Sequence, residues 1–443
     1  LLVFAWGRRA HSTSTGLVAC LMLATSVQFM LSTHWVLIDP LLMLFTTVAA
    51  WAGWELLRGS TDRRVVGGFY LALVLALWTK GLIGPVLIGA GLAVTTLVQR
   101  RSPWQPLRLA GGSVLMAAAI ASVAAAMYLG GGREALWEWG WVNHVQRFTN
   151  PQGTGHVQPP IYYLWTLPFA LMPWVVPLAD ALRPARWRTL DAGTELYRYS
   201  IAMSGGMLLI LSAAATKRGI YLLPVLPLLF LAFAVNVGRW LEVRAQSRLP
   251  GTGWSVQATI VGLFALAPAI AALVYLRRPE PAALAVLVLA IALCAVLILV
   301  RKRAKPDGAL LALAGGGVFA ALGLMLLVPL VLDQEKNMAP FLAWVDKQLP
   351  AGESVHAVSA DESLQAIVPL VTGRSVIMVD ADGLAALQAG TAPLPDFVLV
   401  QSKNSRSRLI KLGAAYRIAG GRNFGRDRNL TLWRRGEGPM PAE

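Results

Sequence analysis

Long apolar runs are the feature that most limits what this chain can fold into. Each is close to the roughly 20 residues that a membrane-spanning helix needs. The clearest are GLVACLMLATSVQFML, LLMLFTTVAAWAGWELL, VLMAAAIASVAAAMYL, AALAVLVLAIALCAVLILV and LLALAGGGVFAALGLMLLVPLVL. Only 14% of the residues are charged, against roughly 25% in soluble domains. The sequence therefore predicts a polytopic α-helical membrane protein.

Hydropathy along the chain predicts about eleven spans. They lie near residues 12–31, 39–57, 65–79, 81–98, 107–129, 160–180, 199–216, 219–238, 254–276, 282–300 and 309–332. The third and fourth spans are short and meet at Lys80, and the seventh and eighth are short and meet at Lys217 and Arg218. The opening LLVFAWGRR resembles the end of a span, so we expect further residues before Leu1.

The formal net charge is +16, which by itself is compatible with nucleic-acid binding. Most lysines and arginines, however, lie in alternate loops between the predicted spans, as the positive-inside rule expects of cytoplasmic loops. The membrane explains the charge, so we expect no nucleic-acid partner. Cys20 and Cys294 both lie inside apolar runs, and they indicate neither a disulfide framework nor a metal cluster.

The sequence changes character after Leu332 and becomes mixed and polar. SVHAVS, SVIMVD, DFVLVQ and NLTLWRR are typical of short strands, and MAPFLAWVDKQL and DESLQAIVPLV of helices between them. We therefore expect a membrane domain over residues 1–332 and a small α/β domain over residues 333–443. With an odd number of spans, this second domain is extracytoplasmic. It has no phosphate-binding glycine loop or nucleophile elbow, so we expect it to be accessory.

Lys80 is the residue that fits an apolar surrounding least. It stands in LALWTKGLIGPVL, where Thr79, two glycines and a proline favour a bend between two short spans. One interpretation is that the side chain snorkels to the membrane interface. The other is a functional site, because ionisable groups at membrane depth are costly unless they have a task.

Two further sites allow a structural or a functional interpretation. Lys217 and Arg218 in ATKRGIYLLPVLP, followed by Tyr221, are either a basic interfacial turn or an anion site, since adjacent Lys and Arg bind phosphate well. Asp39, directly before Pro40, is either a favourable helix N-terminus or a carboxylate that faces an active cavity.

The loop over residues 130–160 is predicted to lie on the same side as Lys80. On a helix, Trp137, Trp141, Val145 and Phe148 share one face, which predicts an amphipathic helix in the membrane interface. The segment NPQGTGHVQPP then predicts a non-helical, lid-like stretch.

Two histidines and one arginine in this loop are candidate ligands. His144 and Arg147 are three residues apart and share a side of the helix. His156 lies in the lid-like stretch, where it is either a substrate contact or an ordinary loop histidine. The two histidines lack the spacing and partners that zinc needs, so we expect no metal.

Six stretches in order carry a resemblance to a known family: GRRAHSTSTGLVACLMLATS, WVLIDPLLMLF, LALWTKGLIGPVL, NHVQRF, HVQPPIYYLWTLPFALMPW and ATKRGIYLLPVLPLLFL. Over residues 1–235 the chain resembles C-type glycosyltransferases that use polyprenyl-phosphate sugars. More narrowly, it resembles the family that contains protein O-mannosyltransferases and the lipid A aminoarabinose transferase.

The resemblance implies roles for the residues that match these motifs. Asp39 matches a second acidic, catalytic position, while the family's principal acidic residue lies in a first outer loop that would precede Leu1. The donor phosphate would be bound by Lys80, Arg147, Lys217, Arg218 and Tyr221. His144 and His156 are further possible substrate contacts.

The implied activity is transfer of a sugar from a polyprenyl-phosphate donor to a hydroxyl or phosphate of lipid A, a protein or another envelope glycan. Attack opposite to the leaving phosphate would invert the anomeric carbon, and no cofactor is expected. The implied location is the bacterial inner membrane. Three alternatives stay open: a transporter or flippase of a lipid-linked or anionic substrate, a ligase or polymerase with the same donor chemistry, and a non-catalytic relative.

Overall fold

A computed structural model gives the fold of the chain. It describes residues 1–33, 37–100, 107–149, 157–176, 192–245, 252–277, 279–303, 306–389, 395–402, 410, 412–424 and 428–436. Internal contacts divide the chain into two compact units, Leu1–Leu327 and Val328–Glu443, and each unit is described by itself.

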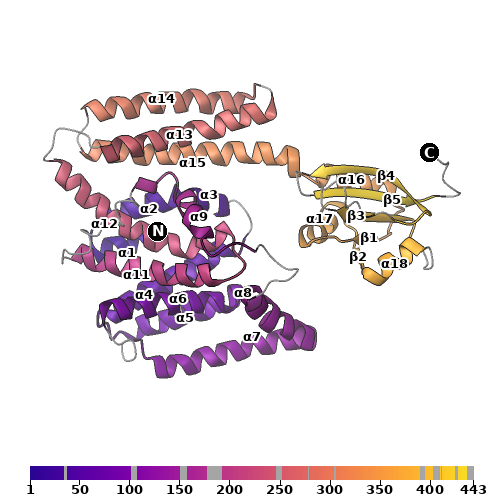
Figure 1. Ribbon diagram of the computed structural model, residues 1–443, viewed down its shortest axis with the longest axis horizontal. Helices are drawn as coiled ribbons and strands as arrows, with labels where there is room; N and C mark the ends of the chain where they lie inside the picture. Colours follow the sequence, from indigo (N-terminus) through magenta and orange to yellow (C-terminus); the bar gives the residue numbers. More distant parts are fainter. Residues whose placement is uncertain are drawn as a thin grey trace. The chain divides into compact units, whose positions relative to one another are not determined.

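The first unit is helical (Figure 1). Its described elements are α1 (Leu2–Ala10), α2 (Thr13–Ala24), α3 (Val27–Thr33), α4 (Asp39–Leu57), α5 (Arg63–Lys80), α6 (Ile83–Gln99), α7 (Leu109–Trp137), the π-helix η1 (Glu138–Gln146), α8 (Arg147–Thr149), α9 (Tyr162–Leu171), α11 (Ala192–Ala213), the 3-10 helix η3 (Gly219–Val225), α12 (Leu226–Ala245), α13 (Thr252–Leu276), α14 (Pro281–Arg303) and α15 (Pro306–Lys336). Helices α13, α14 and α15 lie side by side (Figure 1).

Among the described residues, six helical segments are long and apolar enough to cross a membrane. They are Asp39–Leu57, Leu109–Thr149, Gly219–Val237, Ser255–Leu276, Pro281–Leu299 and Gly315–Asp333. A seventh candidate results if α2 and α3, which are bent by 63°, form one broken span. The prediction of a chain with many apolar helices is confirmed, whereas the number of about eleven spans is not.

The bend between α2 and α3 interrupts what the sequence predicted as one span over residues 12–31. The Thr25 hydroxyl donates to the Leu21 carbonyl at 2.7 Å, and the Ser26 hydroxyl donates to the Leu23 carbonyl at 2.9 Å. The Val27 N–H leaves the helical pattern and donates to the carbonyl of Met172. Hydroxyl side chains that bond to local backbone compete with the helix, and the hydropathy profile does not register this.

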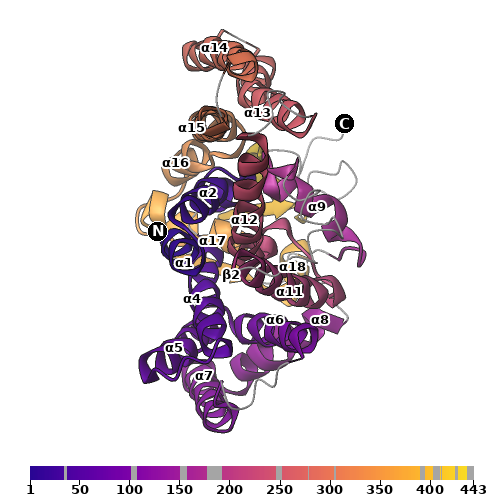
Figure 2. The same ribbon diagram turned by 90° about the vertical axis from the view of Figure 1, so that its left-hand side faces the viewer.

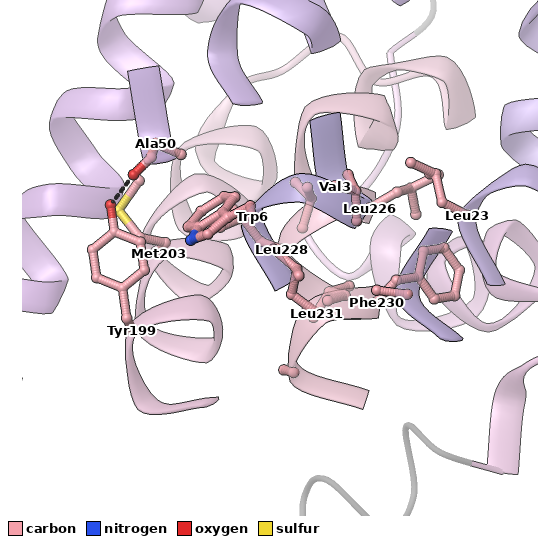
Figure 3. Packing of buried hydrophobic residues seen from close by; sticks show 14 of the residues in the cluster. Val3, Trp6, Leu23, Ala50, Tyr199, Met203, Leu226, Leu228, Phe230 and Leu231 are labelled. Atoms are coloured by element: carbon pink, nitrogen blue, oxygen red, sulfur yellow. Dashed lines mark hydrogen bonds between the residues drawn. The ribbon is translucent and has the colours of Figure 1, made fainter. Parts of the chain in front are cut away.

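Helix α12 is the centre of the helical unit. Every residue from 222 to 236 is buried, which is typical of a helix that is apolar all round. It packs between α2 and α11 (Figure 2). Figure 3 shows its neighbours: Trp6 of α1 lies next to Tyr199 of α11, whose hydroxyl donates to the Ala50 carbonyl of α4 at 2.6 Å. These contacts fix α4 against α11, and α4 carries the first candidate site residue.

The second unit contains a five-stranded sheet in the order β2-β1-β3-β5-β4. The strands are β1 (Val355–Val358), β2 (Val376–Val379), β3 (Phe397–Ser402), β4 (Tyr416–Phe424) and β5 (Arg428–Arg435). β2, β1 and β3 are parallel, and β5 is antiparallel to both β3 and β4. Helices α16 (Ala339–Gln348) and α17 (Glu362–Thr372) pack on one face, and α18 (Ala381–Ala389) packs on the other.

Four of the five strands lie where the sequence predicted strands. The sequence analysis missed β4, because its Gly420–Gly421 pair breaks the apolar alternation that identifies a strand. Gly420 has a packing reason: a Cβ there would lie 2.5 Å from the ring of Trp344 in α16. The glycine therefore lets the strand pass beneath the indole.

Candidate functional site

The joint between α5 and α6 places Lys80 at the last position of α5. Gly81 follows with a φ of +70°, a left-handed conformation that glycine adopts without strain, and α6 begins at Ile83. The glycine ends α5 as a C-terminal cap. The bend that TKG predicted is therefore present, and it places the ammonium at a helix end.

Lys80 forms an ion pair with Asp39, which occupies the first turn of α4. The Asp39 side chain is only 8% exposed and that of Lys80 is 25% exposed. The ammonium also lies 4.8 Å from the centroid of the Tyr221 ring in η3, a cation–π distance. Three residues that the sequence proposed separately thus lie together, and the ammonium has protein partners that snorkelling alone would not require.

The second joint, between α11 and η3, holds Lys217 in a different way. Lys217 is 2% exposed, and its ammonium donates to the carbonyls of Gln158, at 3.1 Å, and Ala214. Burial lowers the pKa of Lys217 below its usual value. Its hydrogen bonds tie the joint to the chain at residue 158, so this lysine has a structural task that the sequence did not indicate.

The same joint is also bound to the segment that carries Arg147. The Thr216 hydroxyl donates to the Arg147 carbonyl at 3.1 Å, and the Ala215 N–H donates to the Phe148 carbonyl at 2.8 Å. These partners were missed by the sequence analysis because they are backbone groups, which leave no trace in residue type.

Arg147 and Arg218 are both exposed, and no described carboxylate forms an ion pair with either. The Tyr163 hydroxyl donates to the Arg218 backbone carbonyl at 3.4 Å, which leaves the guanidinium untouched. Arg218 lies three residues before Tyr221 in the chain, and the backbone of Arg147 is bonded to Thr216 of the same joint. Neither guanidinium has a described carboxylate partner, and exposed guanidinium groups of this kind are suited to a phosphate or carboxylate.

His144 lies against the Lys80 joint. Its Nε2 accepts a hydrogen bond from the Leu82 N–H at 3.0 Å, and its Nδ1 bonds to the Trp139 carbonyl. Both ring nitrogens are thus engaged by backbone groups. The other candidate histidine, His156, lies outside the described residues, as does most of the lid-like stretch.

The four side chains that the sequence predicted to share one face lie at the end of α7, in the π-helix η1 and in α8, so the segment is not the regular α-helix that was expected. α7 breaks at Gly131 and at Gly132, whose φ is +66°. The four side chains after the break are exposed: Trp137 by 60%, Trp141 by 47%, Val145 by 38% and Phe148 by 38%. Exposed aromatic side chains are suited to a membrane interface, and the same segment contains Arg147.

No family model matches the sequence. It is 29% identical over 245 residues to the undecaprenyl phosphate-α-4-amino-4-deoxy-L-arabinose arabinosyl transferase of Edwardsiella ictaluri. The aligned region covers 54% of this chain and 43% of that protein. The transferase of the same name from Yersinia enterocolitica is 27% identical over 252 residues, 55% of this chain and 44% of that protein. The chain thus spans less than half the length of the curated relatives it matches.

The fold matches a solved structure over almost the whole chain. ArnT from Cupriavidus metallidurans bound to undecaprenyl phosphate aligns with a TM-score of 0.70 at 18% identity, covering 97% of this chain and 81% of ArnT. The apo form aligns with a TM-score of 0.69 and covers 80% of that protein. The resemblance to the aminoarabinose transferases that six motifs predicted is therefore confirmed, and the chain has the fold of ArnT.

Proposed function

We propose that this chain belongs to a glycosyltransferase that transfers a sugar from a polyprenyl-phosphate donor to an acceptor hydroxyl or phosphate. The first candidate donor is undecaprenyl phosphate-4-amino-4-deoxy-L-arabinose, after the names of its relatives, and the first candidate acceptor is lipid A. The observation that carries the proposal is the contact of Lys80 with Asp39 and with the Tyr221 ring, in a chain with the fold of ArnT.

In this reaction an acceptor oxygen attacks the anomeric carbon from the face opposite to the phosphate. The bond between that carbon and the phosphate oxygen breaks, and polyprenyl phosphate leaves with the electron pair. Arg147 and Arg218, both exposed and without a described carboxylate partner, stabilise the charge that develops on the leaving oxygen. Tyr221, whose ring contacts Lys80, contributes a hydroxyl. Lys217 supports the joint that carries Arg218, because its ammonium is bound by backbone carbonyls.

Asp39 remains the candidate acidic residue for accepting the proton of the acceptor. In the present state one of its oxygens is bound by Lys80. We propose that the donor phosphate competes for this ammonium, so that donor binding releases the carboxylate. Charge balance favours this exchange, because the Lys80 ammonium loses the Asp39 carboxylate and gains the donor phosphate in its place.

The remaining expectations are part of the same proposal. The helical unit crosses the bacterial inner membrane about eleven times, with the Lys80 site at the outer face and residues 333–443 forming an extracytoplasmic domain. The asymmetric distribution of basic residues between loops supports this orientation. The ArnT comparison supports the transferase, and it lends no support to the alternative of a transporter or flippase.

Sugar transfer in membranes tests the proposal directly. The full protein is incubated with a radiolabelled polyprenyl-phosphate sugar and lipid A, and new glycoside is measured alongside uptake into sealed vesicles. We expect labelled lipid A, and a loss of labelling in Lys80→Ala with membrane insertion unchanged. Label that crosses the vesicle membrane without formation of any glycoside would overturn the transferase in favour of transport.

A further inference from the structure

The turn between α5 and α6 is held from outside by one imidazole. Leu82 precedes the first helical residue of α6, where backbone N–H groups have no partner within the helix. No side chain of the turn itself caps this end of α6. His144, 62 residues further along the chain, supplies the missing acceptor through Nε2 at 3.0 Å from the Leu82 nitrogen.

The hydrogen bonds define which nitrogen carries the proton. Nε2 accepts from an amide, so it presents a lone pair, and Nδ1 then carries the hydrogen that it donates to the Trp139 carbonyl. The ring also lies edge-on to the Trp139 indole, with 5.1 Å between ring centroids. The imidazole is therefore fixed in position, orientation and tautomer, and it has no nitrogen left for a substrate.

Gly81 shows how closely the two segments approach. A Cβ at this position would overlap the His144 ring. The glycine thus serves two purposes, since it also has the positive φ that the end of α5 requires. A turn shaped to receive a particular side chain indicates that the contact is a built feature of the fold.

We propose that His144 is a positioning residue, which holds Lys80 in a fixed relation to Arg147. On one side it binds the amide two residues after Lys80. On the other it belongs to η1, which continues directly into α8 and Arg147. η1 is a π-helix, an irregularity that is frequent at functional sites. The inference rests on the proposed function, in which both cations bind the donor phosphate.

The matched variants are His144→Phe, which keeps a ring and loses the acceptor, and His144→Gln, whose amide oxygen can replace Nε2. Asn143→Ala, at the preceding position of η1, is the control. Hydrogen exchange of a peptide containing Leu82 reports the contact, and the Kd for undecaprenyl phosphate reports its consequence. We expect faster exchange and about tenfold weaker binding in His144→Phe, recovery in His144→Gln, and no change in Asn143→Ala.

A double-mutant cycle separates positioning from general stability. If His144 acts through Lys80, His144→Phe should weaken binding by less than about twofold in the Lys80→Ala background. A full additional tenfold loss in that background, or unchanged exchange at Leu82, would overturn the inference. Undecaprenyl phosphate binding without sugar transfer would overturn the proposed function and leave the inference intact, whereas no binding by the unaltered protein would overturn both.

Discussion

Lys80 in the helical unit and Arg374 in the C-terminal unit are both basic residues that pair with an aspartate, yet their surroundings differ. The guanidinium of Arg374 donates one hydrogen bond to the Asp346 carboxylate and four to backbone carbonyls, so all five of its N–H donors are used. Lys80 has one described hydrogen bond, to Asp39, and an aromatic face. An ammonium has three donors, so Lys80 keeps capacity for another ligand.

The difference separates a cation that holds the fold from one that is available to a substrate. The partners of Arg374 all lie between residues 346 and 353, at the end of α16 and in the loop after it, and its side chain is 12% exposed. Its planar fork matches this fixed set of acceptors. Lys80, by contrast, is a point charge at a joint between helices with one described carboxylate partner, which is compatible with the proposed exchange of Asp39 for a phosphate.

The largest expected effect tests the Lys80 half of this comparison. Lys80→Met should reduce sugar transfer by about 100- to 1000-fold, the usual loss when one donor to a developing oxyanion is removed. Lys80→Arg should keep most of the activity, because the charge remains. The assay is the initial rate of transfer to lipid A in membranes.

Lys80→Met also leaves the buried Asp39 unpaired, which destabilises the fold. The double variant Asp39→Asn/Lys80→Met removes that charge and should recover thermal stability without recovering the binding of undecaprenyl phosphate. If the double variant recovers this binding, Lys80 serves only to neutralise Asp39, and its proposed role at the phosphate is wrong.

A smaller effect, on stability alone, is expected at Arg374. Arg374→Met should lower the free energy of unfolding of the C-terminal unit by about 2–3 kcal/mol, because hydrogen bonds to a charged group are lost. Arg374→Lys should lose most of this as well, since an ammonium cannot reproduce the fork. Limited proteolysis of the full chain during denaturant titration measures both. If Arg374→Lys keeps its stability as well as Lys80→Arg keeps its activity, the proposed difference between the two cations is wrong.

The sequence alone predicted where the irregular positions lie. Lys80 with Gly81, and Lys217 with Arg218, stand out because a charge beside a glycine in an apolar run is a local pattern. Strands β1, β2 and β3 and helices α16 and α17 followed from short-range patterns in the same way, whereas α18 was not predicted. Patterns between neighbouring residues were thus sufficient to predict the two helix joints and most elements of the second unit.

What the sequence did not predict depends on distance along the chain or on backbone groups. Asp39 and Lys80 are 41 residues apart, and nothing in their types indicates that they pair. The partners of Lys217 and His144 are carbonyl and amide groups, which every residue possesses. The first predicted span proved to be bent because two hydroxyls bond to its own backbone. Each of these requires tertiary structure.

A third prediction concerns the exposed guanidinium groups. Arg218→Ala and Arg147→Ala should each weaken undecaprenyl phosphate binding about tenfold, a loss that corresponds to about 1.4 kcal/mol. Neither variant should lower thermal stability, because no described carboxylate pairs with either side chain. Arg63→Ala, at the opposite end of α5 from Lys80, is the control and should bind normally. The losses should shrink at high salt, which screens exposed charges, and a salt-independent loss would indicate a packing role.

The smallest effect concerns Lys217, the lysine that is buried against carbonyls. Burial lowers the pKa of Lys217 in the folded protein below the value of 10.5 that the unfolded chain has. Between these two values the unfolded chain binds more protons than the folded one, so stability contributed by this group rises with pH. The thermal midpoint of the unaltered protein should therefore rise relative to that of Lys217→Met as the pH approaches 10.5. Other groups that titrate in this range do so in both proteins and cancel in the difference. A difference that stays constant, or falls, with pH would mean that the carbonyls of Gln158 and Ala214 compensate fully for burial, and Lys217 would then resemble Arg374 as a satisfied structural cation.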